Sequence, residues 1–134
     1  MRALVATLTD EQLGAMVNKD WSAAGVLGHI AFWDGCALYL AGKLKRSEPF
    51  PATESESQDV DWINDSSRPL IHAIAPRALA ELAVRIAEET DELVASLPDE
   101  LLAGLDETSP LNLVRADHRG EHLDEIEAAS RSRL

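Results

Sequence analysis

The sequence predicts an all-α protein, an antiparallel four-helix bundle, formed as a single domain over residues 1–134. Four segments repeat apolar residues at helical spacing, and no segment shows the apolar–polar alternation of a strand. Hydrophobic residues make up 46% of the chain, which is typical of a globular protein with a core. Helices joined by loops, without strands, bury their apolar faces most simply as an antiparallel bundle.

The composition excludes several classes of partner. Twelve lysines and arginines stand against twenty-four acidic residues, so the net charge is −12. A surface this acidic repels phosphate backbones and anionic membranes, so we expect no nucleic-acid partner and no membrane. Cys36 is the only cysteine, which leaves no intrachain disulfide. Because no secretory signal is evident and no apolar run approaches the ~18 residues of a membrane helix, we expect a cytoplasmic protein.

The first two predicted helices lie near the N-terminus. The first covers residues 2–17, with a new turn at Thr9, because Thr9 and Gln12 have the spacing of a capping box. The second begins behind the N-cap Ser22 and ends at about Ala41, because a glycine follows there. Its apolar stripe consists of Val26, Leu27, Ile30, Trp33, Ala37 and Leu40.

A polar loop and a third helix follow. Residues 43–68 are predicted to be a loop because they are polar and contain two prolines near their start. The piece DVDWIND within it carries Trp62, whose large ring we expect to be buried. The third helix begins near Pro76, a residue suited to the first turn, and runs to about Leu97. Its apolar positions are Leu79, Leu82, Ala83, Ile86, Leu93, Val94 and Leu97.

The fourth predicted helix has histidines where a bundle helix normally has leucines. It follows the linker PDELLAGLDETSP, opens at Pro110 and spans roughly residues 111–130. Its inward face consists of Leu111, Val114, His118, His122, Ile126 and Ala129. Without the two histidines this apolar face would be too thin to bury well, so their side chains need a partner inside the bundle.

The spacing of these histidines indicates a metal site. His118 and His122 are four residues apart, which stacks both imidazoles on one side of a helix. Imidazole nitrogen binds zinc, nickel, iron and cobalt. A third donor is needed, and His29 on the inward side of the second helix is the natural one. Three protein ligands leave an open coordination position, as reactive metal sites do. The simpler alternatives are buried neutral histidines or a chance pair on the surface.

Four further residues could support such a site. Asp34 and Glu125 could accept the second N–H of a ligand imidazole, although surface charge is the simpler interpretation. Trp33, one turn after His29, could line a pocket or only pack in the core. Asn64 could contact a ligand or cap a turn.

Other candidate residues carry less weight. HRGEH matches the H-x-x-E-H pattern of one class of zinc protease, but Gly120 interrupts it and no helix follows to complete that site. We therefore expect Glu121 to be solvated. Cys36 lies ~10.5 Å along the helix from His29, too far to share an ion, and is expected to be a buried, inert thiol. His72 is expected to pack or to be exposed.

The order of these pieces resembles a known family. The stretch DWSAAGVLGHIAFWD is similar to the Trp-Ser/Thr, His-bearing helix and Trp-Asp pattern of the DinB-like (YfiT-type) metal-binding four-helix bundles. HRGEHLDEI resembles their His-x-x-x-His segment, and DVDWIND and SLPDELL fall in matching places between them. Such relatives begin their first helix earlier, so either the start codon is mis-assigned or the first helix is shortened and the bundle lacks part of a wall. A missing wall would expose apolar surface and favour a homodimer.

The resemblance implies a divalent metal site with His29, His118 and His122 as its ligands, and zinc or nickel as the metal. Relatives include bacillithiol S-transferases and the N-terminal domain of mycothiol-dependent maleylpyruvate isomerase. The enzyme hypothesis is therefore a metal-dependent thiol transferase or isomerase, with a low-molecular-weight thiol and a small-molecule substrate as partners. The competing hypothesis is a non-catalytic bundle that binds a metal or a small molecule. A third is a metal-free bundle with neutral histidines.

Overall fold

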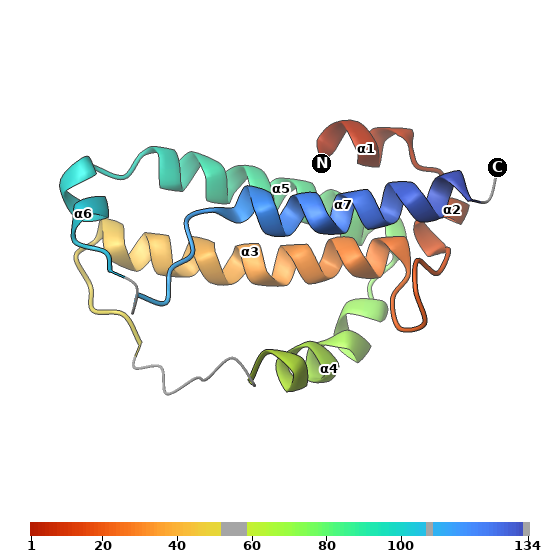
Figure 1. The fold of residues 1–134 in the computed structure, drawn as a ribbon, viewed down its shortest axis with the longest axis horizontal. Coiled ribbons are helices and arrows are strands. Elements are labelled where there is room, and N and C mark those ends of the chain that lie inside the picture. Colours follow the sequence, from red (N-terminus) through yellow and green to blue (C-terminus); the bar gives the residue numbers. More distant parts are fainter. Residues whose placement is uncertain (52–58, 107–108, 133–134) are drawn as a thin grey trace.

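The computed structural model describes residues 1–51, 59–106 and 109–132, and it is helical throughout (Figure 1). Among these residues the only β-type pairing is an isolated bridge between Met16 and Ser22, so the prediction of an all-α protein is confirmed. The helices are α1 (Arg2–Thr7), α2 (Asp10–Gly14), α3 (Ala23–Lys45), α4 (Asp59–His72), α5 (Pro76–Ala95), α6 (Asp99–Ala103) and α7 (Arg115–Arg131).

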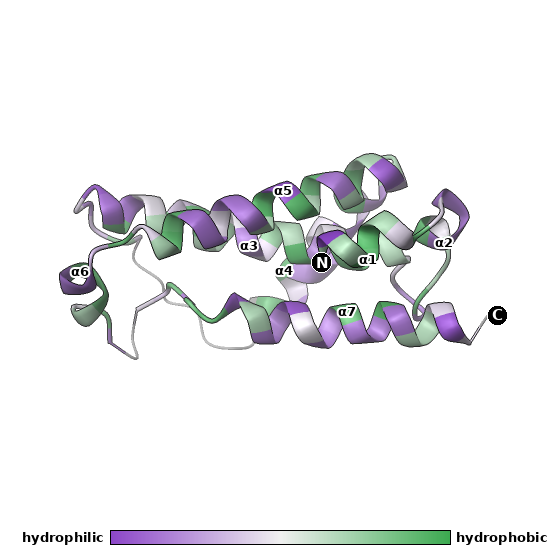
Figure 2. Cartoon of the chain, turned by 90° about the horizontal axis from the view of Figure 1, so that it is seen from above, coloured by the Kyte–Doolittle hydropathy of each residue, from purple (hydrophilic) through white to green (hydrophobic). Residues whose placement is uncertain are grey.

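Three long helices lie side by side, and the shorter α4 packs against α3 (Figure 1). α3 and α5 run in the same direction, while α4 and α7 run in the opposite one. α3 contacts all three of the others and is the centre of the fold. Figure 2 shows that α7 carries many hydrophilic residues along its length. The interface between α3 and α7 therefore has polar residues where a core is expected.

Small residues let α4 and α5 approach the backbone of α3. A Cβ built on Gly28 would lie 2.6 Å from Ile71 Cγ2 of α4 and 2.8 Å from Leu79 Cδ2 of α5. Both of these side chains are buried. A Cβ at position 28 would force these side chains to shift, so glycine allows the close packing of α4 and α5 against α3 next to His29.

α3 is also long and apolar enough to cross a membrane by length and composition, alone among the helices described. The sequence-based statement that no run is long enough was therefore too strict. However, 61% of its most apolar window is buried inside the structure. That burial is typical of the core helix of a bundle, and it agrees with the central place of α3 between α4, α5 and α7.

The N-terminal predictions need two corrections. The segment 2–17 is two short helices, because the chain becomes extended at Leu8, while the capping box of Thr9 and Gln12 is present as predicted. α3 does not end at Ala41 but continues to Lys45. The reason is a second apolar cluster at this end of the fold, which includes Ala37, Ala41, Leu97 and Leu111.

The predicted loop over residues 43–68 is wrong in its second half, where α4 begins at Asp59. Residues 52–58 of that loop lie outside the described residues. Trp62 is 61% exposed, so its predicted burial is wrong as well. α4 was missed because it contains Pro69, a residue that usually ends a helix, and because its composition is polar. One side of the helix is nevertheless buried at Ile71.

The later boundaries are closer to prediction. α5 begins with Pro76 in its first turn, as expected, and ends two residues earlier than Leu97. The linker after it contains α6. α7 begins only at Arg115, so Val114 is not an inward helical position and is 58% exposed. The Asn112 side chain accepts a hydrogen bond from the Val114 N–H at 2.9 Å, which holds a turn before the helix.

Candidate metal centre

Three imidazoles meet between α3 and α7, and we call His29, His118 and His122 the histidine cluster. His118 and His122 lie one turn apart on the same face of α7 and point at α3. The ring centroids of the three pairs are 4.8 to 5.3 Å apart. The Nε2 atoms of His29 and His118 are 3.4 Å apart, and one nitrogen from each residue lies within 4.8 Å of the other two. The three side chains are partly buried.

This donor set fits a divalent metal ion of the zinc type. Zinc binds imidazole nitrogen at about 2.0–2.1 Å, so two nitrogens on one ion lie about 3.0–3.4 Å apart. The 3.4 Å between Nε2 of His29 and Nε2 of His118 matches that spacing. The described residues offer one such group of three potential ligands.

The environment keeps two of the imidazoles neutral. The pKa of His29 is lowered to about 4, first by burial and then by the neighbouring His122, His118 and Arg115. The pKa of His118 is also lowered to about 4, by burial first and then chiefly by Arg115 and His122. At neutral pH both rings are therefore uncharged, which is the form that binds a metal.

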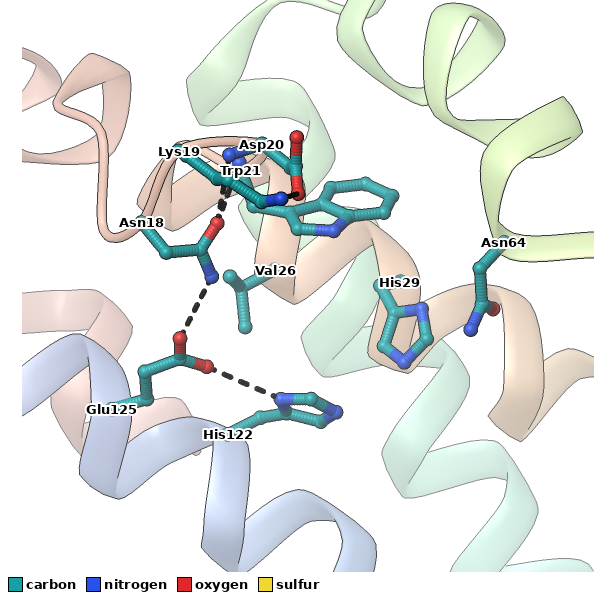
Figure 3. Close-up of a pocket in the computed structure, with 9 residues that line it drawn as sticks. All are labelled: Asn18, Lys19, Asp20, Trp21, Val26, His29, Asn64, His122 and Glu125. Atoms are coloured by element: carbon teal, nitrogen blue, oxygen red, sulfur yellow. Dashed lines mark hydrogen bonds and ion pairs between the residues drawn. The ribbon is translucent and has the colours of Figure 1, made fainter. Parts of the chain in front are cut away.

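A carboxylate and an amide lie behind His122. Glu125 Oε2 is 3.5 Å from His122 Nδ1, and its Oε1 accepts a hydrogen bond from the Asn18 side chain at 2.8 Å. Asn18 Oδ1 in turn accepts from the backbone N–H groups of Asp20 and Trp21, both at 3.0 Å. The turn between α2 and α3 is thus tied to α7 beside the histidine cluster (Figure 3).

Two tryptophans flank His29. The Trp21 and Trp33 rings lie 5.7 Å and 6.5 Å from the His29 ring, centroid to centroid. Trp33 Nε1 donates a hydrogen bond to Asn64 Oδ1 at 3.0 Å, which ties α4 to α3. Trp33 and Asn64 thus bind each other. Asn64 also lines the cavity next to His29, where it could contact a ligand as predicted (Figure 3).

A cavity of 410 Å³ opens beside the histidine cluster. That volume is within the range of small-molecule sites. Its wall mixes an apolar part with amide, carboxylate and ammonium groups. The lining residues are Asn18, Lys19, Asp20, Trp21, Val26, His29, Asn64, His122 and Glu125.

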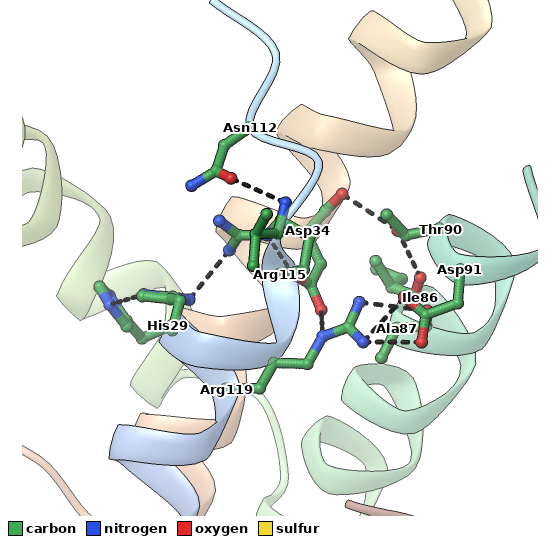
Figure 4. A network of polar contacts seen from close by, with 11 residues as sticks. His29, Asp34, Ile86, Ala87, Thr90, Asp91, Asn112, Arg115 and Arg119 are labelled. Atoms are coloured by element: carbon green, nitrogen blue, oxygen red, sulfur yellow. Dashed lines mark hydrogen bonds and ion pairs between the residues drawn. The ribbon is translucent and has the colours of Figure 1, made fainter. Parts of the chain in front are cut away.

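A second polar group lies further along the same interface, and we call Asp34, Arg115, Arg119 and Asp91 the ion-pair cluster (Figure 4). Asp34 is fully buried, and its two oxygens accept from Arg115 Nε at 2.8 Å and Arg119 Nε at 2.7 Å. Arg119 also donates to both oxygens of Asp91. Two carboxylates thus face two guanidinium groups. The interpretation of Asp34 as surface charge is wrong.

Arg115 joins the two clusters. Besides its bond to Asp34, its Nη2 lies 2.9 Å from Nδ1 of His118. An arginine N–H can only donate, so the imidazole nitrogen accepts. The polar contacts thus continue from Asp34 through Arg115 to His118 and on to His29.

Comparison with known proteins places the chain in a family. The sequence model of the DinB superfamily matches residues 1–126. The chain belongs to the DinB superfamily. The DinB match includes all three members of the histidine cluster. No curated protein and no solved structure gave a match to the chain.

Within this DinB fold the structure brings the three predicted ligands together and sets the other candidates apart from them. Cys36 is half-buried, and burial raises the pKa of its thiol. His72 is exposed and packs edge-on against Trp21, with ring centroids 5.3 Å apart. Glu121 is exposed, as expected. Glu125 is more than surface charge, because it contacts His122 and lines the cavity.

Sequence reasoning missed Arg115 and Arg119. Both lie on helix α7 near His118: Arg115 is three residues before it, and Arg119 is one residue after it. A buried helical face with two arginines requires carboxylates on the facing helices, and Asp34 is the acidic residue of α3 that is in reach. Finding that pairing from the sequence requires the direction and register in which α7 lies on α3, as well as the face of α7.

Proposed function

We propose that this DinB-superfamily protein binds one divalent metal ion, zinc or nickel, through His29, His118 and His122. The observation that carries the proposal is the meeting of three imidazole nitrogens, within 4.8 Å of one another, from two different helices. Neutral His29 and His118 favour a cation over a proton at neutral pH. The adjoining cavity supports a ligand-binding role rather than a closed structural site.

We further propose that the protein is an enzyme that uses a small thiol in S-transfer or isomerisation. A divalent metal with three protein ligands keeps a position for a thiol and lowers the pKa of that thiol. Trp21 and Val26 supply the apolar wall against which the organic part of a ligand would pack. Asn64 offers an amide on the opposite wall (Figure 3).

Glu125 is the group that this chain offers for proton transfer. Its carboxylate lines the cavity, contacts the His122 ring at 3.5 Å and is held by the Asn18 amide. In an addition to an electrophilic double bond, a fixed carboxylate in that place could accept the proton that the thiol loses as its sulfur–carbon bond forms, and could return that proton to the neighbouring carbon that receives the electrons of the broken π bond. The same contact also orients His122, which is the role a carboxylate usually has beside a metal ligand.

The alternative is a non-catalytic protein that binds a metal or a small molecule. The metal-free form of this alternative is favoured by the contact chain from Arg115 through His118 to His29, which gives these two histidines partners without any ion. For either function we further propose a cytoplasmic location, a small-molecule partner and a homodimer.

The test begins with metal content. Protein purified without added chelator is analysed by elemental mass spectrometry and is expected to carry about one zinc or nickel ion per chain. His122→Ala is expected to lose it, while the matched variant His72→Ala, which removes a histidine outside the cluster, is expected to keep it. Equal metal content in the two variants would contradict the site.

Activity is tested on the metal-loaded protein. Low-molecular-weight thiols are offered with a chromogenic electrophile, and conjugation is measured for the unchanged chain, His122→Ala and Glu125→Gln. We expect conjugation to depend on His122 and to fall with Glu125→Gln. A metal-loaded protein that gives no conjugation with any of the common bacterial thiols would leave the non-catalytic alternative.

A further inference from the structure

The contact between Arg115 and His118 has a consequence for metal binding. A neutral imidazole has one N–H and one lone pair. Because the guanidinium of Arg115 donates to Nδ1 at 2.9 Å, the proton of His118 is on Nε2. That N–H points at Nε2 of His29, 3.4 Å away, and makes His29 the acceptor.

This arrangement is opposite to the one that a metal requires. A metal-bound histidine uses the lone pair of one nitrogen and donates the N–H of the other to an acceptor, usually a carboxylate or a carbonyl. For Nε2 of His118 to bind an ion, its proton must be on Nδ1. An N–H on Nδ1 would then face the N–H of Arg115, and two donors cannot bond.

Arg115 is held firmly in this position. Its side chain is 9% exposed, and its Nε donates to the buried Asp34 at 2.8 Å. A guanidinium stays charged at every accessible pH, so it cannot become an acceptor. Arg115 therefore stands between His118 and Asp34, the carboxylate that would otherwise be the natural acceptor for a metal-bound ring.

We propose that Arg115 competes with the metal for His118 and sets the metal affinity of the site. The inference rests on the proposed metal site. Binding of the ion requires the guanidinium to withdraw from Nδ1 while it keeps its bond to Asp34, and the His118 proton moves from Nε2 to Nδ1. The site is thereby tuned to bind its metal more weakly than three free imidazoles in the same places would.

Zinc affinity of the purified chain tests this, with a chromophoric chelator as competitor. Arg115→Gln removes the fixed donor and supplies an amide oxygen that can accept from Nδ1–H, and we expect zinc to bind at least ~10-fold tighter. Arg119→Gln is the matched control, because it removes the same charge from Asp34 without touching His118. We expect its zinc affinity to rise less than that of Arg115→Gln, because Arg119 acts on His118 only through its charge while its hydrogen bonds go to Asp34 and Asp91.

Arg115→Lys guards against a failure of the glutamine variant to fold. It keeps a positive charge for Asp34 but lacks the guanidinium that reaches both Asp34 and His118, so we expect an intermediate gain in zinc affinity. Imidazole ¹H–¹⁵N spectra give a second readout that does not depend on affinity. In the metal-free chain the His118 signals, assigned by their loss in His118→Ala, are expected to show the Nε2–H form, and zinc is expected to convert it to Nδ1–H.

The outcomes separate this inference from the proposed function. If the unchanged chain binds zinc and Arg115→Gln binds it no tighter, the competition is refuted while the metal site stands. Equal gains in the two glutamine variants would mean that charge alone acts, which also refutes it. Binding by Arg115→Gln but not by the unchanged chain would support the competition and contradict a resident metal. If neither binds zinc, both ideas fail.

Discussion

The interface between α3 and α7 contains two polar clusters that differ in how their groups are satisfied. In the ion-pair cluster, buried Asp34 has a guanidinium on each oxygen, and Arg119 spans it to Asp91. Opposite charges meet throughout, and the group is complete without any outside partner. Such a cluster fixes the packing of α7 on α3, since removing one member leaves its partner charged and buried.

The histidine cluster is different because it gathers groups of one kind. Three imidazoles face one another, and burial together with their neighbours lowers the pKa values of His29 and His118 to about 4. A cavity lies on one side, and a cation, Arg115, lies on the other. The comparison teaches that a polar interface built for packing balances its own charges. The histidine cluster instead gathers metal-binding nitrogens beside a cavity, and its contacts with Arg115 would have to change for an ion to bind.

Removing Asp34 should have the largest effect on stability. Asp34→Ala leaves Arg115 and Arg119 without their shared carboxylate in a buried place, so we expect the free energy of unfolding to fall by about 3–5 kcal/mol. Asp91→Ala is the control, because Asp91 pairs with the same Arg119 but is 61% exposed, and we expect a change within about 1 kcal/mol. Urea denaturation measures both. Similar losses would show that burial does not distinguish the two pairs.

Zinc should raise the free energy of unfolding of the chain by binding at the histidine cluster. With free zinc at 100 times its dissociation constant, linkage predicts a gain of about 2.7 kcal/mol in the free energy of unfolding. We expect His122→Ala to abolish this gain and the exposed His72→Ala to retain it. Thermal melts with and without zinc give the comparison. A gain that survives His122→Ala would place the bound zinc elsewhere.

Packing behind the histidine cluster can be tested with two glycines of α3. In Gly28→Ala the new Cβ would lie 2.6 Å from Ile71 and 2.8 Å from Leu79, so we expect a loss of about 1–3 kcal/mol. In Gly35→Ala the Cβ meets nothing within 4 Å, and the better helix former should add about 0.5–1 kcal/mol. Chemical denaturation of the two variants gives the sign of each change in the free energy of unfolding. A loss in both would mean that α3 tolerates no added volume on either side.

The helical class and the three histidines could be predicted because they depend on local patterns. The spacing of His118 and His122 on one helical face is a property of the α-helix itself, and the capping box at Thr9 needs only its own turn. α4 was missed although its apolar residues recur at helical spacing, because its composition is polar and it contains Pro69. Its buried residues are few, and it is held through contacts with α3 such as Trp33 to Asn64, which no local pattern reveals.

The ion-pair cluster was missed for a related reason. Asp34, Arg115 and Arg119 are residue types that usually lie at the surface, and a single charge on a helix is usually solvated. Their burial follows only when α3 and α7 are paired in the observed direction, which brings position 34 opposite positions 115 and 119. The same pairing brings His29 opposite His118. Paired histidines at helical spacing indicate a metal site, whereas two arginines at helical spacing are equally common on a solvated face.

A further expected effect is a dependence of metal-free stability on pH, and it belongs to the histidine cluster. His29 and His118 have pKa values of about 4 in the folded chain and near 6.5 when unfolded. Between these values the unfolded chain binds more protons, so the free energy of unfolding falls as the pH is lowered from about 6.5 towards 4. Urea midpoints at pH 7.5 and pH 5.0, with chelator present, should show this fall.

The double variant His29→Gln, His118→Gln separates this effect from other acid-sensitive groups. It removes both depressed pKa values and leaves the carboxylates of the ion-pair cluster in place, so its urea midpoint should change less between the same two pH values. An equal change in the double variant would assign the acid sensitivity to groups outside the histidine cluster. A smaller change would mean that the neutral imidazoles of His29 and His118 make the folded chain less stable in acid.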